Sequence, residues 1–122
     1  MKKIAIYVCG EISKTCTANG CLNAFNEKKD SFADYAFEQL ELVSFNTCNG
    51  CDKAPVESLE LKIEKFKKAE VDTVHLSTCI RGRCDHYETF AEMLSESFNV
   101  IGYTHGSAAG SKDNTINRTC KR

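Results

Sequence analysis

Two cysteines that stand three residues apart, Cys48 and Cys51, follow an apolar run that begins at Leu40. Thiols at this spacing either hold one metal ion together or form a disulfide with each other. Nearly all the other cysteines, and His105, also fall just beyond an apolar run or in the polar loop after one. This recurrence predicts a site assembled from several parts of the chain, to which the pair contributes two ligands.

The elements that must position these thiols are short apolar runs separated by helical patterns. The clearest helix is predicted from Pro55 to Ala69, where apolar side chains recur at three- and four-residue steps. Shorter helical patterns follow Cys21 and Tyr87. Four runs have the character of buried strands: residues 3–8, 40–46, 73–78 and 99–103. This alternation predicts an α/β fold, a small doubly wound sheet of about four parallel strands in the order 2-1-3-4, with helices on both faces.

The carboxyl ends of parallel strands share one edge of the sheet, and ligands bind in the crevice there. The four predicted strands end at or near Cys9, Cys48, Cys79 and His105, and the loops that leave this edge carry the remaining candidates. The predicted metal ligands are Cys9, Cys16, Cys21, Cys48, Cys51, Cys79, Cys84, His86 and His105.

Sulfur with some imidazole suits zinc, an iron-sulfur cluster or copper(I), whereas calcium and magnesium need oxygen ligands. Zinc is the predicted cofactor, with an iron-sulfur cluster as the alternative. Zinc needs only four ligands, so about nine candidates indicate two sites, one multinuclear cluster, or thiols that do redox work. His75, inside a predicted strand, is equally compatible with a core side chain and with a ligand. Cys120 is predicted to lie outside the site.

The chain has 122 residues, enough for one domain, which we place at residues 1–106, followed by a polar C-terminal tail at residues 107–122. A formal net charge of -1 and the lack of a basic stripe argue against nucleic acid as a partner. The sequence shows neither a signal peptide nor an apolar run long enough to span a membrane. We therefore expect a cytoplasmic protein without membrane partners, in which eight cysteines indicate metal or thiol chemistry rather than disulfides.

These motifs together resemble the CGGC-domain family of small prokaryotic proteins rich in cysteine and histidine. The resemblance runs from the first strand to His105 and includes Cys48-Asn49-Gly50-Cys51, with Asn49 in place of the family's first glycine. Asp52-Lys53 stands where the family commonly has proline and glycine, and Cys84-Asp85-His86 stands where it often has Cys-Pro-His. The resemblance implies metal binding, with zinc as the expected ion.

Three functions follow from the residues. The leading hypothesis is a metal-binding protein whose thiolates hold zinc or an iron-sulfur cluster. The second is a thiol-disulfide oxidoreductase that uses Cys48 and Cys51, although the chain has no tryptophan and only Pro55, and so lacks the usual partners of a thioredoxin motif. The third is a metal carrier or sensor.

Overall fold

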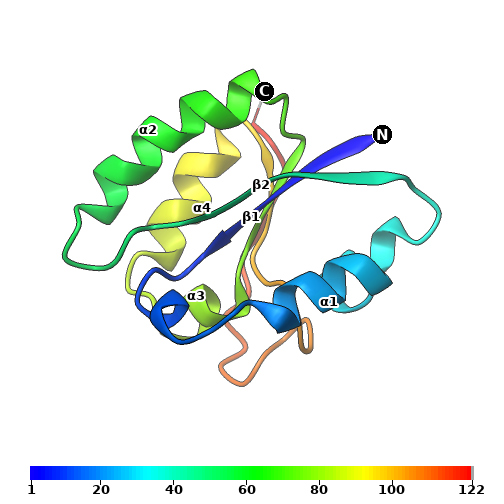
Figure 1. The fold of residues 1–122 in the computed structure, drawn as a ribbon, viewed down its shortest axis with the longest axis horizontal. Coiled ribbons are helices and arrows are strands. Elements are labelled where there is room, and N and C mark those ends of the chain that lie inside the picture. The colour runs from blue at the N-terminus through cyan, green and yellow to red at the C-terminus, as the bar shows by residue number, and fades with distance from the viewer. Residues whose placement is uncertain (122) are drawn as a thin grey trace.

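The computed structural model describes residues 1–121, which fold around a twisted sheet (Figure 1). Within these residues the sheet has five strands in the order β2-β1-β3-β4-β5. The first four are parallel, as predicted, and their order is the predicted one. The expected number of about four was wrong by one, because an antiparallel edge strand is added beside β4. The bounds are β1 (Lys2–Val8), β2 (Leu40–Thr47), β3 (Thr73–Leu76), β4 (Asn99–Ile101) and β5 (Asn117–Arg118).

Helices cover both faces of the sheet, which confirms the doubly wound α/β fold. On one face lie α2 (Pro55–Lys68) and α4 (Tyr87–Ser95), and on the other lie α1 (Asn19–Glu27) and the 3-10 helix η2 (Asp30–Tyr35). Two short elements, η1 (Ile12–Lys14) and α3 (Thr78–Arg83), follow the carboxyl ends of β1 and β3. None of the helices in residues 1–121 is long and apolar enough to cross a membrane.

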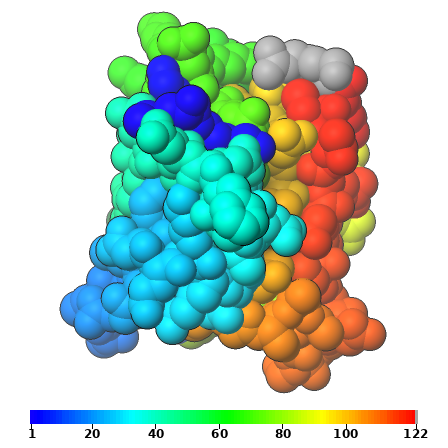
Figure 2. Space-filling view, turned by 90° about the vertical axis from the view of Figure 1, so that its right-hand side faces the viewer, coloured from blue at the N-terminus to red at the C-terminus, as the bar shows by residue number. Residues whose placement is uncertain are grey.

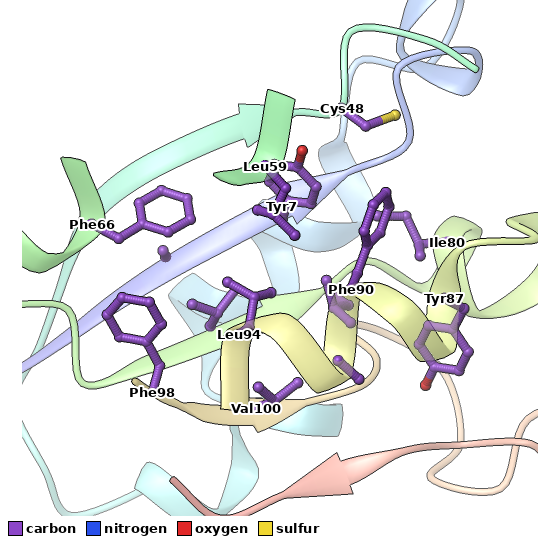
Figure 3. Packing of buried hydrophobic residues seen from close by; sticks show 14 of the residues in the cluster. Tyr7, Cys48, Leu59, Phe66, Ile80, Tyr87, Phe90, Leu94, Phe98 and Val100 are labelled. Carbon is purple, nitrogen blue, oxygen red and sulfur yellow. The ribbon is translucent and has the colours of Figure 1, made fainter. Parts of the chain in front are cut away.

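The alternating side chains of β1 connect the two faces, because successive residues of a strand point to opposite sides. Ala5 and Tyr7 pack with residues of α2 and α4, whereas Ile4, Ile6 and Val8 pack with residues of α1 and η2. Figure 3 shows the first of these layers, with the Tyr7 ring between the helices and the sheet. The apolar layers therefore fix where the ends of β1, β2 and β3 lie.

The third strand is shorter than predicted, because β3 ends at Leu76 and the chain then turns into α3. Ser77 begins this helix, and its side-chain oxygen accepts a hydrogen bond from the Ile80 N–H. Cap bonds of this kind satisfy a helix-end donor that would otherwise lack a partner. Cys79 therefore lies in the first turn of α3 rather than at the end of a strand.

The C-terminal segment, predicted as a polar tail, lies against the rest of the domain. Its residues Asn117 and Arg118 form β5 beside β4, and Ile116 packs on the core. The buried Arg81 guanidinium donates hydrogen bonds to the Ser107 carbonyl at 2.9 Å and to the Thr115 hydroxyl at 3.0 Å. Figure 2 shows this segment, in orange and red, lying along one side of the molecule. The placement of a boundary at residue 106 remains a prediction.

Candidate functional site

The turn that carries the cysteine pair leaves β2 through two residues with left-handed backbone. Asn49 has φ 70° and Gly50 has φ 113°, and Asn49 is among the residues that tolerate this region best. The Asn49 N–H donates to the Thr47 hydroxyl at 3.0 Å, and the Asn49 side-chain amide donates to Ser58 of α2 at 3.0 Å. The turn buries Cys48 and leaves Cys51 exposed.

The segment after β1 is packed directly on this turn. The Gly10 N–H donates to the Cys48 sulfur at 3.2 Å, and a Cβ at Gly10 would lie 2.3 Å from the Gly50 nitrogen. Only glycine permits so close an approach of two backbones. The Glu11 carboxylate accepts from the Cys51 N–H at 3.2 Å and from Lys14 at 3.1 Å. Both bonds lower the pKa of Glu11, and the bond from Lys14 has the larger effect.

Four thiols lie around this contact, and we call them the inner thiol group. Burial raises the pKa of Cys84, and charge on the sulfurs of Cys48, Cys9 and Cys51 raises it further. A hydrogen bond from the His86 N–H lowers this pKa in part. Desolvation also raises the pKa of the exposed Cys51, followed by the charges of Cys9, Glu11 and Cys48. Charge on any one of these sulfurs therefore acts on others of the group. The inner thiol group is Cys9, Cys48, Cys51 and Cys84.

The hydroxyl of Tyr7 points toward this group (Figure 3). Tyr7 is fully buried, and its hydroxyl oxygen is a buried side-chain atom without a hydrogen-bond partner in the described residues. Burial, followed by the charges of Cys48 and Cys84, raises the pKa of this hydroxyl, so it carries its proton. An unpaired buried hydroxyl costs free energy. Sequence reasoning missed Tyr7, because a tyrosine inside an apolar strand reads as core.

A second set of thiols lines a cavity of about 280 Å³ between the end of β1 and the start of α1. We call Cys16, Cys21 and Cys79 the cavity thiols; Cys9 and His105 line the same space. Cys21 forms a hydrogen bond with the Thr104 hydroxyl at 3.1 Å, and Cys79 forms one with the Ser77 hydroxyl at 2.8 Å. Burial raises the pKa of Cys21, a hydrogen bond from Thr104 lowers it, and the charges of Cys79 and Cys16 raise it.

The two other candidate histidines occupy different surroundings. The His105 ring lies against the first turn of α1, where a Cβ at Gly20 would be 3.0 Å from two of its ring atoms. His86 precedes α4, its N–H donates to the Cys84 sulfur at 3.4 Å, and its ring centroid is 5.8 Å from that of Phe90. His105 thus belongs to the cavity, and His86 adjoins the inner thiol group.

His75 is a core side chain. Its Nδ1 donates to the Tyr103 carbonyl at 3.2 Å, and its Nε2 accepts from the Tyr35 hydroxyl at 3.1 Å. The Ser31 hydroxyl lies 3.0 Å from Nδ1, and the Phe32 ring stacks on the imidazole with centroids 4.1 Å apart. Burial lowers the pKa of His75 to about 4. Both ring nitrogens are already hydrogen-bonded. The structure therefore favours the role of a core side chain over that of a metal ligand.

The donor set fits a soft metal, and the geometry shows what binding would require. In residues 1–121, no three His, Cys, Asp or Glu side chains are gathered closely enough to hold an ion as they stand. Binding would require the thiols to lose their protons and to move together around the ion. Cys51 lies on an exposed turn.

These features define an α/β protein whose sheet carries a thiol-rich carboxyl edge. The CGGC domain model matches residues 3–105, and the chain therefore belongs to the CGGC domain family, to which metal binding is attributed. An uncharacterized protein from Methanocaldococcus jannaschii is 29% identical over 110 residues, covering 80% of each chain. No solved structure matches the chain.

Proposed function

We propose that this protein binds a soft metal ion through the inner thiol group, with zinc as the expected ion. The observation that carries the proposal is that the end of β1 lies directly on the turn after β2, with the Gly10 N–H bonded to the Cys48 sulfur, and that charge on Cys9, Cys48 and Cys51 acts on Cys84 at the end of α3. Four thiolates are a ligand set that zinc takes in tetrahedral sites. Cys9, Cys48, Cys51 and Cys84 would hold the ion.

The surroundings of these thiols supply what a metal-thiolate site needs. Hydrogen bonds to ligand sulfurs orient the ligands and stabilise their charge. The Gly10 N–H already donates to Cys48, and the His86 N–H donates to Cys84. The proton on the Tyr7 hydroxyl has no acceptor among the described residues, and a Cys48 thiolate that moved into hydrogen-bond distance on metal binding would provide one.

The metal would supply the positive charge that the inner thiol group lacks. Lys62, whose ammonium lies 5.6 Å from the centre of the Tyr7 ring, donates to the Thr47 carbonyl, and burial lowers its pKa while the charge of Cys48 raises it. Arg83 also acts on Cys51, and Lys14, the other cation near Cys51, is paired with Glu11. These side chains do not balance four thiolates. A divalent cation does so more completely, and its binding would release the thiol protons.

The proposal is tested by anaerobic purification followed by elemental analysis and an absorption spectrum. We expect about one zinc per chain. Iron with acid-labile sulfide would instead identify the iron-sulfur alternative, which four cysteines also suit. Cobalt(II) substitution then reports the ligands, because tetrahedral cobalt with several thiolates has intense absorption bands. Replacing Cys48→Ser, Cys51→Ser or Cys84→Ser should weaken these bands.

Cys120→Ser is the matched control, since the Cys120 N–H donates to the side chain of Asn99, the first residue of β4, at the opposite end of that strand from the predicted site. A reduced, fully folded protein that takes up neither zinc nor cobalt would contradict the proposal. So would equal cobalt spectra for Cys120→Ser and the inner-group variants.

Two related functions use the same residues. A metal carrier or sensor is favoured by the exposure of Cys51, because an accessible ligand permits exchange with a partner; rapid transfer of zinc to a competing chelator would support it. Thiol-disulfide exchange through Cys48 and Cys51 is less favoured, because the raised pKa of Cys51 leaves little of the reactive thiolate at neutral pH. Either role suits a reducing cytoplasm, where we place the protein.

A further inference from the structure

The cavity beside the inner thiol group has the size of an organic ligand. Its volume is about 280 Å³. A cavity of about 150 Å³ in another protein interior holds a benzene molecule, and one water occupies about 30 Å³ of liquid. A bare metal ion would leave most of this space unfilled, so the cavity fits a ligand of roughly twice the volume of benzene.

The walls indicate which chemical class this ligand has. Apolar side chains of Val8, Ile12, Ala18 and Phe45 contribute to the lining, together with the cavity thiols. Among the described residues that line the cavity there is no aspartate, glutamate, lysine or arginine. A phosphate, carboxylate or ammonium group would find no fixed countercharge there. The ligand is therefore uncharged and partly apolar, with a thiophilic atom as its reactive part.

Two of the cavity thiols are best placed to hold such an atom. Cys21 and Cys79 come from α1 and α3 and both line the cavity, and the Thr104 hydroxyl that bonds to Cys21 also accepts from the N–H of Thr78, the neighbour of Cys79. Each sulfur is hydrogen-bonded to a neighbouring hydroxyl, Thr104 for Cys21 and Ser77 for Cys79. Cys16 is exposed at the rim. A ligand that needs two thiols suits this arrangement better than an ion that needs four.

We propose that the cavity binds a trivalent metalloid atom that carries one small apolar organic group, through bonds to Cys21 and Cys79. The cavity shares Cys9 in its lining with the inner thiol group, but this proposal uses neither that thiol nor the metal of the proposed function. For an organoarsenic(III) oxide the step is R–As=O + 2 Cys–SH → R–As(S–Cys)₂ + H₂O. Two arsenic-sulfur bonds form, the oxide leaves as water with both thiol protons, and arsenic stays trivalent, so no oxidant or reductant is needed.

Phenylarsine oxide is the probe, and the parent protein is the Cys48→Ser/Cys51→Ser variant, which removes the competing thiol pair. Intact mass spectrometry should show one phenylarsenic group per chain with loss of one water. Cys21→Ser or Cys79→Ser in this parent should weaken binding at least tenfold, whereas Cys16→Ser should change it less than threefold. Arsenite, which lacks the apolar group, should bind at least tenfold more weakly than the phenyl compound.

The apolar part of the site has its own test. Ile12→Ala should weaken binding of the phenyl compound several-fold and leave arsenite binding unchanged. Equal affinity for the two arsenicals, or Cys21→Ser and Cys79→Ser variants that still bind as the parent does, would overturn the proposal. If the Cys48→Ser/Cys51→Ser parent no longer binds zinc but still binds the phenylarsenic group, the two ligands use different sites.

Circular dichroism checks that the parent folds. If it does not, wild-type protein is treated with phenylarsine oxide at one equivalent and then alkylated. Protection of Cys21 and Cys79 supports the proposal. The proposal is contradicted if one equivalent of phenylarsine oxide protects only Cys48 and Cys51 from alkylation and two equivalents still leave Cys21 and Cys79 unprotected.

Discussion

The Gly10 N–H donates a hydrogen bond to the sulfur of Cys48 across 3.2 Å, and this bond joins the segment after β1 to the turn after β2. It exists because the Gly10 backbone lies against Asn49 and Gly50 with no side chain between them. A backbone donor fixed in this way holds the thiol in place before any ligand arrives. The inner thiol group is therefore organised by a glycine outside the cysteine motif.

A methyl group at Gly10 should damage both stability and metal binding. Its Cβ would lie 2.3 Å from the Gly50 nitrogen and 2.8 Å from the Asn49 carbonyl carbon, so the turn must move. We expect Gly10→Ala to lower the free energy of unfolding by about 1–3 kcal/mol, measured by urea denaturation, and to weaken zinc binding at least tenfold. Gly82→Ala is the control, since a Cβ there meets nothing within 4 Å. Its helical position should make that variant as stable as wild type or slightly more so.

Removing the hydroxyl of Tyr7 should have opposite effects on the two forms of the protein. In the metal-free form the hydroxyl is buried without a partner in the described residues, so Tyr7→Phe should leave the free energy of unfolding unchanged or raise it by about 1 kcal/mol. Zinc affinity, measured by chelator competition, should fall several-fold because a donor to the bound thiolate is lost.

The matched control for this variant is Tyr35→Phe, which removes a hydroxyl that bonds to His75 on the other side of the sheet. It should destabilise the protein by about 1–2 kcal/mol without changing zinc affinity. If Tyr7→Phe left zinc affinity as it was, the hydroxyl would have no part in binding.

Zinc uptake should release protons from the inner thiol group. The pKa values of Cys51 and Cys84 are raised, so both thiols are protonated at neutral pH and must lose their protons to bind the metal. Zinc affinity should therefore rise as the pH rises from 6 to 8. Calorimetry in buffers of different ionisation enthalpy should count up to about four protons per zinc, and one fewer for Cys51→Ser. An affinity independent of pH would argue for carboxylate ligands instead, because these are already ionised above pH 6.

His75 should make the stability of the metal-free protein depend on pH in the acid range. Its pKa is lowered to about 4 in the folded state, whereas an unfolded histidine has a pKa of about 6.5. Between these values the unfolded state takes up the proton and the folded state does not, so stability falls as the pH drops from 6.5 toward 4. The loss attributable to His75 should approach about 3 kcal/mol. The difference between wild type and His75→Gln in urea denaturation at several pH values isolates this part, and parallel curves would refute it.

Local patterns along the chain predict the order of the four parallel strands, the helix from Pro55 and the thiol-rich edge. The apolar runs of β1 to β4 and the periodic helix require a layered α/β fold. Once the strands are parallel, their carboxyl ends must share an edge, and the cysteines that follow them must come together there. The edge strand β5 could not be predicted in this way, because it is only two residues long and polar.

The sequence by itself determined which residues reach the edge, and the tertiary structure decided how they are divided there. Cys9, Cys48, Cys79 and Cys84 pack with the cluster on the α2 and α4 face, whereas Cys21 packs with α1 on the other. The spacing of the cysteines in the sequence does not predict the face on which each one packs. That face depends on the side of the sheet to which each connecting helix crosses. The same holds for Tyr7 and His75, whose neighbours come from distant segments. The Tyr7 hydroxyl is buried without a partner among the described residues, whereas contacts with Ser31, Tyr35 and Tyr103 hold His75 in the core.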